Sequence, residues 1–257
     1  SRELGDVYKR QKQDTQTLLE LAKVRGWGTG VVTTTRITHA TPASTYAHIC
    51  HRDAENDIAS QLVPSSQGDT YQRYNVKLKD GVDVILGGGK RQFLPKDQGG
   101  ERIDQRNLIA EMQQAGYRVV YDQIQLSQMK LGKNEKLLGL FNTSNLSYDL
   151  NRTKKNLPEP SLKQMTLAAL DILTQNKNGF FLMVEGGRID HALHDTNAKR
   201  ALQDTIALNE ALDATIKKLQ QSDPELKNTL IVITADHDHT LILNGYAKRT
   251  GKYVQGQ

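Results

Sequence analysis

Stretches with helical periodicity alternate along this chain of 257 residues with short runs that are apolar or β-branched. The helical stretches are residues 14–26, 106–116, 161–176 and 198–221, and the apolar runs are residues 29–35, 82–89, 117–121, 179–185 and 229–236. Apolar runs without polar alternation are typical of strands buried on both faces, as in parallel sheets covered by helices. We therefore predict an α/β protein with a mostly parallel central sheet and helices on both faces.

Composition is that of an ordinary folded, water-soluble protein, because 37% of the residues are hydrophobic and 25% are charged. The net charge of +5 is spread thinly. Its densest basic cluster, residues 151–156, lacks interleaved aromatic residues, so we expect a solvated loop and no nucleic-acid partner. No run approaches the roughly 18 apolar residues of a membrane span, so none is predicted.

Residues 39–53 predict a further helix with Pro42 in its first turn, where the missing N–H has no cost. The single cysteine, Cys50, is expected on this helix as a small buried thiol. His48 on the same stretch is expected to be structural. Arg52 has two interpretations, because its planar fork matches two phosphate oxygens but an arginine also suits a helix C-terminus.

Residue types that bind metals follow three of the predicted strands at their carboxyl ends. They are His39 and Thr41 after the first strand, Glu185, Asp190 and His194 after the fourth, and Asp236 and His237 at the end of the fifth. Ligands bind beyond the carboxyl ends of the strands in doubly wound sheets, so all three groups are expected on one rim.

Asp190 and His194 are four residues apart, so both lie on one face of a helix that begins near residue 189 and can bind one ion. Such a pair is more often a solvated helix surface. Here it follows a buried strand through two glycines, and a mixture of carboxylate and imidazole suits zinc. A polar turn would explain one of the four residues 236–239 comfortably, but explains four consecutive acids and histidines less well.

Five long motifs resemble the alkaline phosphatase family, in that family's order. They are HATPASTYAH at residues 39–48, DVILGGGKRQF at 83–93, LLGLFNTSNLSYDLNR at 137–152, VEGGRIDHALHDTNAKRAL at 184–202 and LIVITADHDHT at 230–240. The resemblance implies a three-layer sandwich and a metal-dependent phosphomonoesterase. Residues 1–11 are expected to be a non-native leader, and residues 12–257 a partial catalytic domain open at both ends.

The resemblance also implies two Zn²⁺ ions and one Mg²⁺ ion, with roles carried over residue by residue. Asp190 and His194 match ligands of the first zinc, Asp236 and His237 match ligands of the second zinc, Glu185 and Thr41 match ligands of the magnesium, and Arg52 matches the arginine that binds the substrate phosphate. His39 and His191 match positions beside the magnesium, where family members carry either an Asp and Lys pair or a His pair.

The family's nucleophilic serine is not matched, because no Asp-Ser-Ala motif occurs in the 257 residues. An early aspartate that joins the second zinc and the magnesium, and a third histidine for the first zinc, are also expected to be missing. We therefore expect the complete protein to hydrolyse phosphate monoesters through a phosphoserine, and this chain alone to be inactive.

Two alternatives stay open at this point. One is a related phosphodiesterase or sulfatase, and the other is a non-catalytic module that binds metal or phosphate. By resemblance, the complete protein is expected to be a homodimer in the periplasm or outside the cell.

Overall fold

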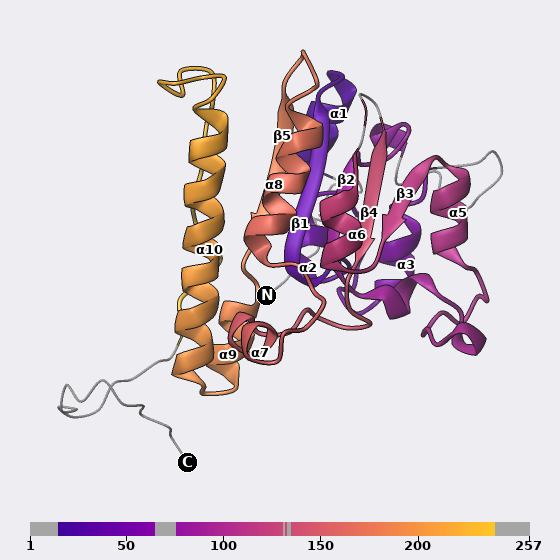
Figure 1. Ribbon diagram of the computed structural model, residues 1–257. Helices are drawn as coiled ribbons and strands as arrows, with labels where there is room; N and C mark the ends of the chain where they lie inside the picture. The colour runs from indigo at the N-terminus through magenta and orange to yellow at the C-terminus, as the bar shows by residue number, and fades with distance from the viewer. Residues whose placement is uncertain (1–14, 65–75, 131, 133–134, 240–257) are drawn as a thin grey trace.

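The structure is a computed structural model that describes residues 15–64, 76–130, 132 and 135–239 (Figure 1). Its centre is a five-stranded sheet in the order β3-β4-β2-β1-β5, and every neighbouring pair is parallel. The strands are β1 (Gly28–Arg36), β2 (Val84–Gly88), β3 (Tyr117–Val120), β4 (Lys136–Leu140) and β5 (Phe180–Glu185). The expected leader at residues 1–11 lies outside the described residues.

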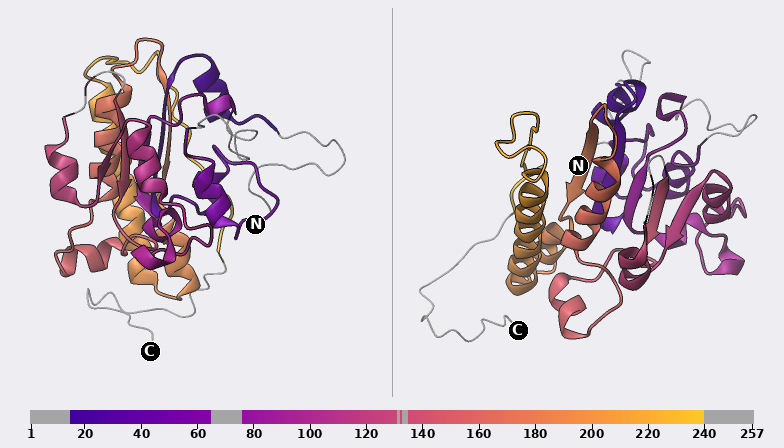
Figure 2. Two further views of the ribbon diagram at one scale, coloured as in Figure 1. Left: turned by 90° about the vertical axis from the view of Figure 1, so that its right-hand side faces the viewer. Right: turned by 45° about the horizontal axis from the view of Figure 1, so that its top comes forward.

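Helices cover both faces of the sheet (Figures 1 and 2). One face carries α1 (Leu18–Val24), α2 (Ala40–Ala43), α3 (Glu55–Ser60) and α5 (Leu108–Gln114), and the other carries α6 (Gln123–Gln128) and α8 (Leu162–Leu173). The helix α10 (Ala198–Leu219) packs against α8 beyond the edge strand β5, and α7 (Asp149–Lys154) and α9 (Arg188–His194) lie near its beginning. The predicted three-layer α/β sandwich is therefore confirmed.

Successive residues of the central strands point into two separate cores. Val31 belongs to the core beneath α1, α3 and α5, whereas its neighbour Val32 belongs to the core beneath α6 and α8. Leu138 and Leu137 divide in the same way. Both faces of the sheet are buried, and this burial is the physical reason why the strands appear in the sequence as continuous apolar runs.

Hydrogen-bonding side chains fix where the helices begin. Ser161 caps α8 as predicted, because its hydroxyl accepts from the backbone N–H of Gln164 at 3.2 Å while the Gln164 side chain accepts from the Ser161 N–H at 2.8 Å. Thr17 and Glu20 form the same reciprocal pair at α1. Asp14, where the predicted helical stretch 14–26 begins, lies outside the described residues.

The helix predicted for residues 39–53 is wrong beyond its first turn, because α2 ends at Ala43. The buried side chain of Gln61 accepts from the backbone N–H of His48 at 2.9 Å and donates to its carbonyl at 3.0 Å. Both backbone groups are thus occupied outside a helix. Cys50 is accordingly exposed and not helical, which corrects the expectation of a buried thiol.

Three further assignments need correction. The basic residues expected in a loop lie largely on α7, and β4 was not recognised as a strand. Residues 229–236 were expected to form a strand, but they are extended without strand pairing, and Leu230 is 88% exposed. A β-prone run becomes a strand only when a neighbour pairs with its backbone groups. The segment instead runs back past α10 towards the carboxyl ends of the strands (Figure 1).

Candidate functional site

The candidate site lies where β1 and β5 end. The chain leaves β1 towards β2 on one side and later crosses from β4 to β5 on the other side, so the direction of winding reverses between β1 and β5. Thr33 on β1 is paired with Glu185, the last residue of β5. Doubly wound sheets bind their ligands at such a switch point.

Glu185 is the buried carboxylate of this site. Its Oε2 accepts from the hydroxyl of Thr33 at 2.5 Å and from that of Thr35 at 3.2 Å, and the Thr41 side chain also hydrogen-bonds to it. Burial raises the pKa of Glu185, the three hydroxyls oppose this, and the nearby charge of Asp236 raises it further. Carboxylate and hydroxyl oxygens are hard donors of the kind that Mg²⁺ prefers, so this group fits that ion.

A second donor group lies on α9 and on the segment that returns past α10. The Nε2 of His194 is 3.4 Å from Oδ1 of Asp190, and the Nε2 of His239 is 3.8 Å from the same oxygen. The three donor atoms lie within 4.8 Å of one another. Asp190 Oδ1 is buried without a hydrogen-bond partner. A cation between these donors would satisfy that oxygen, and one carboxylate with two imidazoles suits Zn²⁺.

His239 was not assigned a metal-binding role from the sequence. Its signal was the run of four acids and histidines at 236–239, of which only the first two were assigned a role. In the structure the His239 ring lies 4.7 Å from the His194 ring, centroid to centroid. That the family's own third zinc histidine is missing from this chain stays a prediction. The segment reaches Asp190 without forming a strand, so neither periodicity nor spacing could place it.

Asp236 and His237 form a smaller, exposed pair. His237 Nε2 is 3.4 Å from Asp236 Oδ2, and both side chains are exposed. A hydrogen bond to the Asp238 carbonyl and the charge of Asp236 raise the pKa of His237. Asp236 also acts on the pKa of Glu185, so this pair lies at the same rim as the buried carboxylate. Within the described part of the chain, it offers two donors to a cation, fewer than the group at Asp190.

His39 and His191 face each other between these donor groups. Their ring centroids are 5.3 Å apart and their planes are nearly perpendicular. Burial, then the positive charge of Arg36, lowers the pKa of His39 to about 4, and burial also lowers the pKa of His191. Both imidazoles are therefore neutral at neutral pH and add no charge to the site.

Arg52 lies in the turn between α2 and α3 and is half-buried. The expectation that it sits on the helix after Thr41 is wrong, because that helix ends at Ala43. Its positive charge contributes to the low pKa of His39, which places it near the rim. The helix C-terminus interpretation of Arg52 therefore does not hold.

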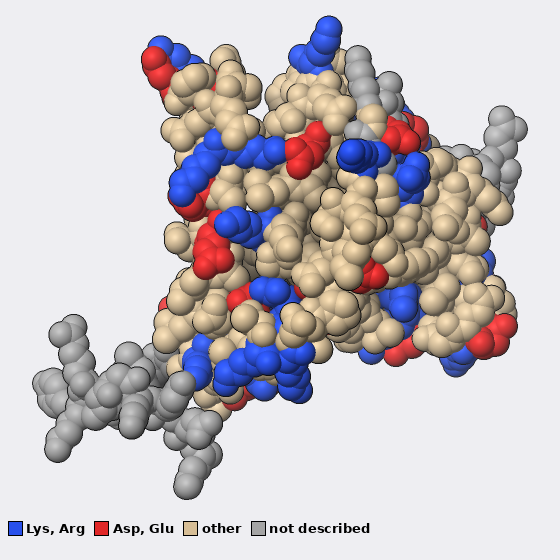
Figure 3. Space-filling view, in the orientation of Figure 1, with Lys and Arg blue, Asp and Glu red and all other residues tan. Residues whose placement is uncertain are grey.

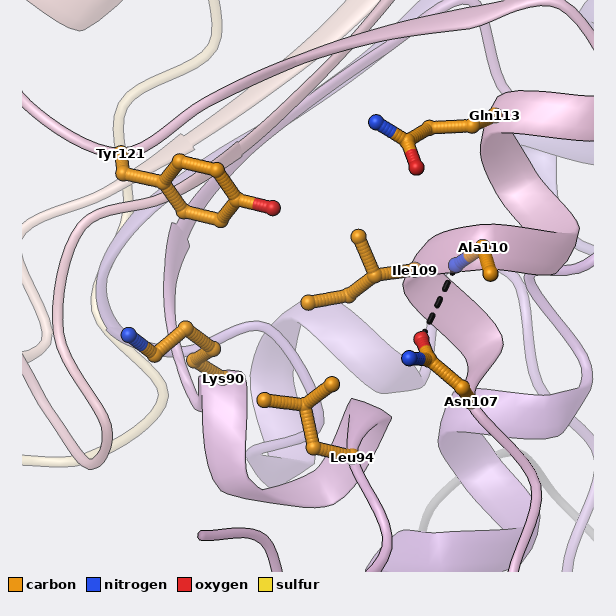
Figure 4. A pocket seen from close by; sticks show the side chains of 7 residues that line it. All are labelled: Lys90, Leu94, Asn107, Ile109, Ala110, Gln113 and Tyr121. Atoms are coloured by element: carbon orange, nitrogen blue, oxygen red, sulfur yellow. Dashed lines mark hydrogen bonds between the residues drawn. The ribbon is translucent and has the colours of Figure 1, made fainter. Parts of the chain in front are cut away.

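A separate hollow of about 320 Å³ opens between η2 (Lys90–Phe93), α5 and the end of β3 (Figure 4). It is lined by Lys90, Leu94, Asn107, Ile109, Ala110, Gln113 and Tyr121. The lining has no carboxylate or imidazole, so it lacks the donors found at the end of β5.

The fold and the site define a class of protein: a parallel α/β sandwich with cation donors at its switch point. Its family follows from the sequence profile of alkaline phosphatase, which matches residues 6–257. This chain belongs to the alkaline phosphatase family.

Curated relatives agree with this assignment. The membrane-bound alkaline phosphatase of Bombyx mori is 37% identical over 95% of this chain and 45% of its own length. The tissue-nonspecific alkaline phosphatase isozyme of Rattus norvegicus is 36% identical over 93% of this chain and 48% of its own length. Alkaline phosphatase 4 of Bacillus subtilis is 40% identical over 86% of this chain and 42% of its own length. The chain spans about half the length of the curated relatives it matches.

Solved structures show the same fold. The alkaline phosphatase of Thermus thermophilus superposes with a TM-score of 0.66 at 37% identity, over 78% of this chain and 38% of that one. The cold-active alkaline phosphatase of a Shewanella species superposes with a TM-score of 0.67 at 27% identity, over 85% of this chain and 46% of that one.

None of the helices in the described ranges has the length and apolar character that crossing a membrane requires.

Proposed function

We propose that the complete protein hydrolyses phosphate monoesters with two zinc ions and one magnesium ion at the ends of β1 and β5. The observation that carries the proposal is the convergence of Asp190, His194 and His239 around a buried, unpartnered carboxylate oxygen. Asp190 and His194 would hold the first zinc, and His239 would be a third donor to it. Bound zinc supplies Lewis acidity that polarises a phosphoryl oxygen.

The other residues divide the remaining tasks. Asp236 and His237 would hold the second zinc, and Glu185 and Thr41 the magnesium. Arg52 would orient the substrate, because a guanidinium donates two parallel hydrogen bonds to phosphate oxygens. Because the low pKa of His39 keeps its imidazole neutral, Arg52 and the metals would supply the positive charge that attracts the phosphate dianion.

The covalent step needs a nucleophile from elsewhere in the complete protein. We propose that a serine hydroxyl attacks phosphorus and displaces the alcohol, and that water then displaces the serine from the phosphoserine to give inorganic phosphate, as in nucleophilic catalysis generally. Because Asp-Ser-Ala does not occur in these 257 residues, the chain by itself is proposed to have no turnover. A homodimer located in the periplasm or outside the cell is proposed for the complete protein on family membership alone.

The test compares this chain with the complete protein, each supplied with zinc and magnesium, on a chromogenic phosphate monoester and the matching diester. We expect the complete protein to prefer the monoester by at least 100-fold and to lose activity on chelation, and the chain to show no turnover. A preference for the diester or for a sulfate ester would support the related-enzyme alternative. Turnover by the chain would contradict the need for an external serine, and metal binding without turnover in the complete protein would support a binding module.

A further inference from the structure

Arg188, the first residue of α9, links three elements around the candidate site. Its backbone N–H donates to the hydroxyl of Thr34 on β1 at 3.2 Å. Its guanidinium carbon lies 3.8 Å from the centroid of the Tyr148 ring, and its Nη1 lies 2.7 Å from Nδ1 of His191. Arg188 is not one of the metal donors proposed above, and it is not the arginine proposed to bind the substrate phosphate.

Tyr148 is itself held firmly. Its side chain is nearly buried, and its hydroxyl donates to Asp195 Oδ2 at 2.6 Å. Arg200 on α10 also stacks on this ring, with its guanidinium carbon 4.6 Å from the centroid. Lys and Arg side chains gather over α7 and α9 on this side of the molecule (Figure 3). A guanidinium stacked on a fixed aromatic ring has little freedom to turn, so its N–H groups keep their direction.

The contact between Arg188 and His191 has only one possible polarity. A guanidinium carries N–H donors and no acceptor, so Nδ1 of His191 must accept. An imidazole that accepts at Nδ1 carries its proton on Nε2. We infer that Arg188 is a positioning residue, which fixes His191 in the Nε2–H tautomer and holds its ring against His39.

This tautomer gives His191 a role different from that of its neighbours on α9. With Nδ1 occupied and Nε2 protonated, the ring has no lone pair for a metal, whereas Asp190 and His194 have free donors. His191 then offers an N–H to oxygens bound at the rim. That last step rests on the proposed function, because it needs a phosphate or a hydrated cation there. The tautomer itself does not depend on it.

The test is ¹⁵N NMR of the histidine rings in the purified chain, with His191 assigned from a His191→Gln variant. We expect the wild-type ring to give an acceptor-type signal at Nδ1 and an N–H signal at Nε2. Arg188→Met should move both signals towards the averaged values of a tautomer mixture. Arg200→Met is the matched control, because it also removes one cation from the Tyr148 ring but does not contact His191. It should leave the His191 signals in place.

Several results would overturn the inference. They are an Nδ1–H or doubly protonated His191 in the wild-type chain, an unchanged tautomer in folded Arg188→Met, and an equal shift in Arg200→Met. The tautomer of His191 measured in the wild-type chain tests the inference even if Arg188→Met does not fold. Titrating Zn²⁺ separates this inference from the proposed function. Ligation should shift the signals of His194 and His239 but leave the tautomer of His191 unchanged. Zinc that binds His191 directly would contradict the inference. Zinc that leaves the ring signals of His191, His194 and His239 all unchanged would contradict the proposed function alone.

Discussion

At the residue scale, His39 is the side chain that we expect to set the affinity of the proposed magnesium site. It lies two residues before Thr41, whose side chain hydrogen-bonds to Glu185. Its Nδ1 is buried without a hydrogen-bond partner, and its pKa is lowered to about 4, mainly by burial. A neutral imidazole cannot attract Mg²⁺ as a carboxylate does, and Mg²⁺ prefers oxygen ligands.

We therefore predict that His39→Asp strengthens magnesium binding in the complete protein by roughly tenfold, which corresponds to about 1.4 kcal/mol. Calorimetric titration of Mg²⁺ into the metal-depleted proteins measures this directly. Gln221→Glu is a suitable control, because it adds the same charge at an exposed position just beyond the end of α10, the end of that helix that points away from α9 (Figure 1). Equal affinities in wild type and His39→Asp would remove His39 from the magnesium site.

At the scale of elements, Asp204 joins α10 to the start of α7. Its side chain is 4% exposed, and its two oxygens accept from the backbone N–H of Asp149 at 3.3 and 3.4 Å. Burial raises the pKa of Asp204 to about 6, although the positive charges of Arg188 and Arg152 act in the opposite direction. The folded protein therefore holds this proton more tightly than the unfolded chain, in which an aspartate titrates near 3.9.

The sign of the resulting pH dependence follows from this difference. Between about pH 4 and pH 6 the folded state binds more protons, so Asp204 lowers the stability as the pH rises through this window. Asp204→Asn should remove this loss and raise the free energy of unfolding at pH 8 by about 1–3 kcal/mol. Urea unfolding at pH 4 and pH 8 tests it. The stabilisation should be present at pH 8 and nearly absent at pH 4, and a variant less stable at pH 8 would show that the carboxylate is needed for its contacts.

Elements with a strong local signal could be predicted from the sequence. The helix α8 has a reciprocal cap and an apolar face, and β1 and β2 are buried on both faces, whereas β5 is apolar but only partly buried. The five-residue β4 was missed because its burial results from its place between β2 and β3, not from a pattern of its own. The end of α2 was missed for a related reason, since the distant side chain of Gln61 replaces the helical hydrogen bonds of His48.

The residues of the candidate site likewise fall into those that the sequence indicated and those that it did not. Asp190 and His194 were found because a spacing of four places two side chains on one helical face. Glu185 and Thr41 were found because they follow predicted strands, and only their assignment to magnesium came from family resemblance; the structure places them in contact. His239 and Arg188 were not found, because both act through segments that approach only in the folded chain.

On the scale of the whole molecule, several large apolar side chains between residues 202 and 233 are exposed. Three residues of the returning segment are largely exposed, namely Leu230, Val232 and Ile233, and Leu202 and Ile206 on α10 are exposed as well. Among the described residues, β5 pairs only with β1, so its other edge has no partner strand. Exposed apolar side chains and an unpaired strand edge each favour association with another chain.

We predict that the purified chain associates with itself at micromolar concentration, and that Val232→Lys together with Ile233→Lys weakens this association. Burying each side chain contributes about 1.5–3 kcal/mol, so the double variant should raise the dissociation constant at least 100-fold. Sedimentation velocity over a concentration series measures the change. Ile103→Lys is the control, because Ile103 is also exposed, at 76%, but lines a separate hollow together with residues at the start of α3. Weakening by Ile103→Lys alone, or association that survives the double variant unchanged, would place the contact elsewhere on the molecule.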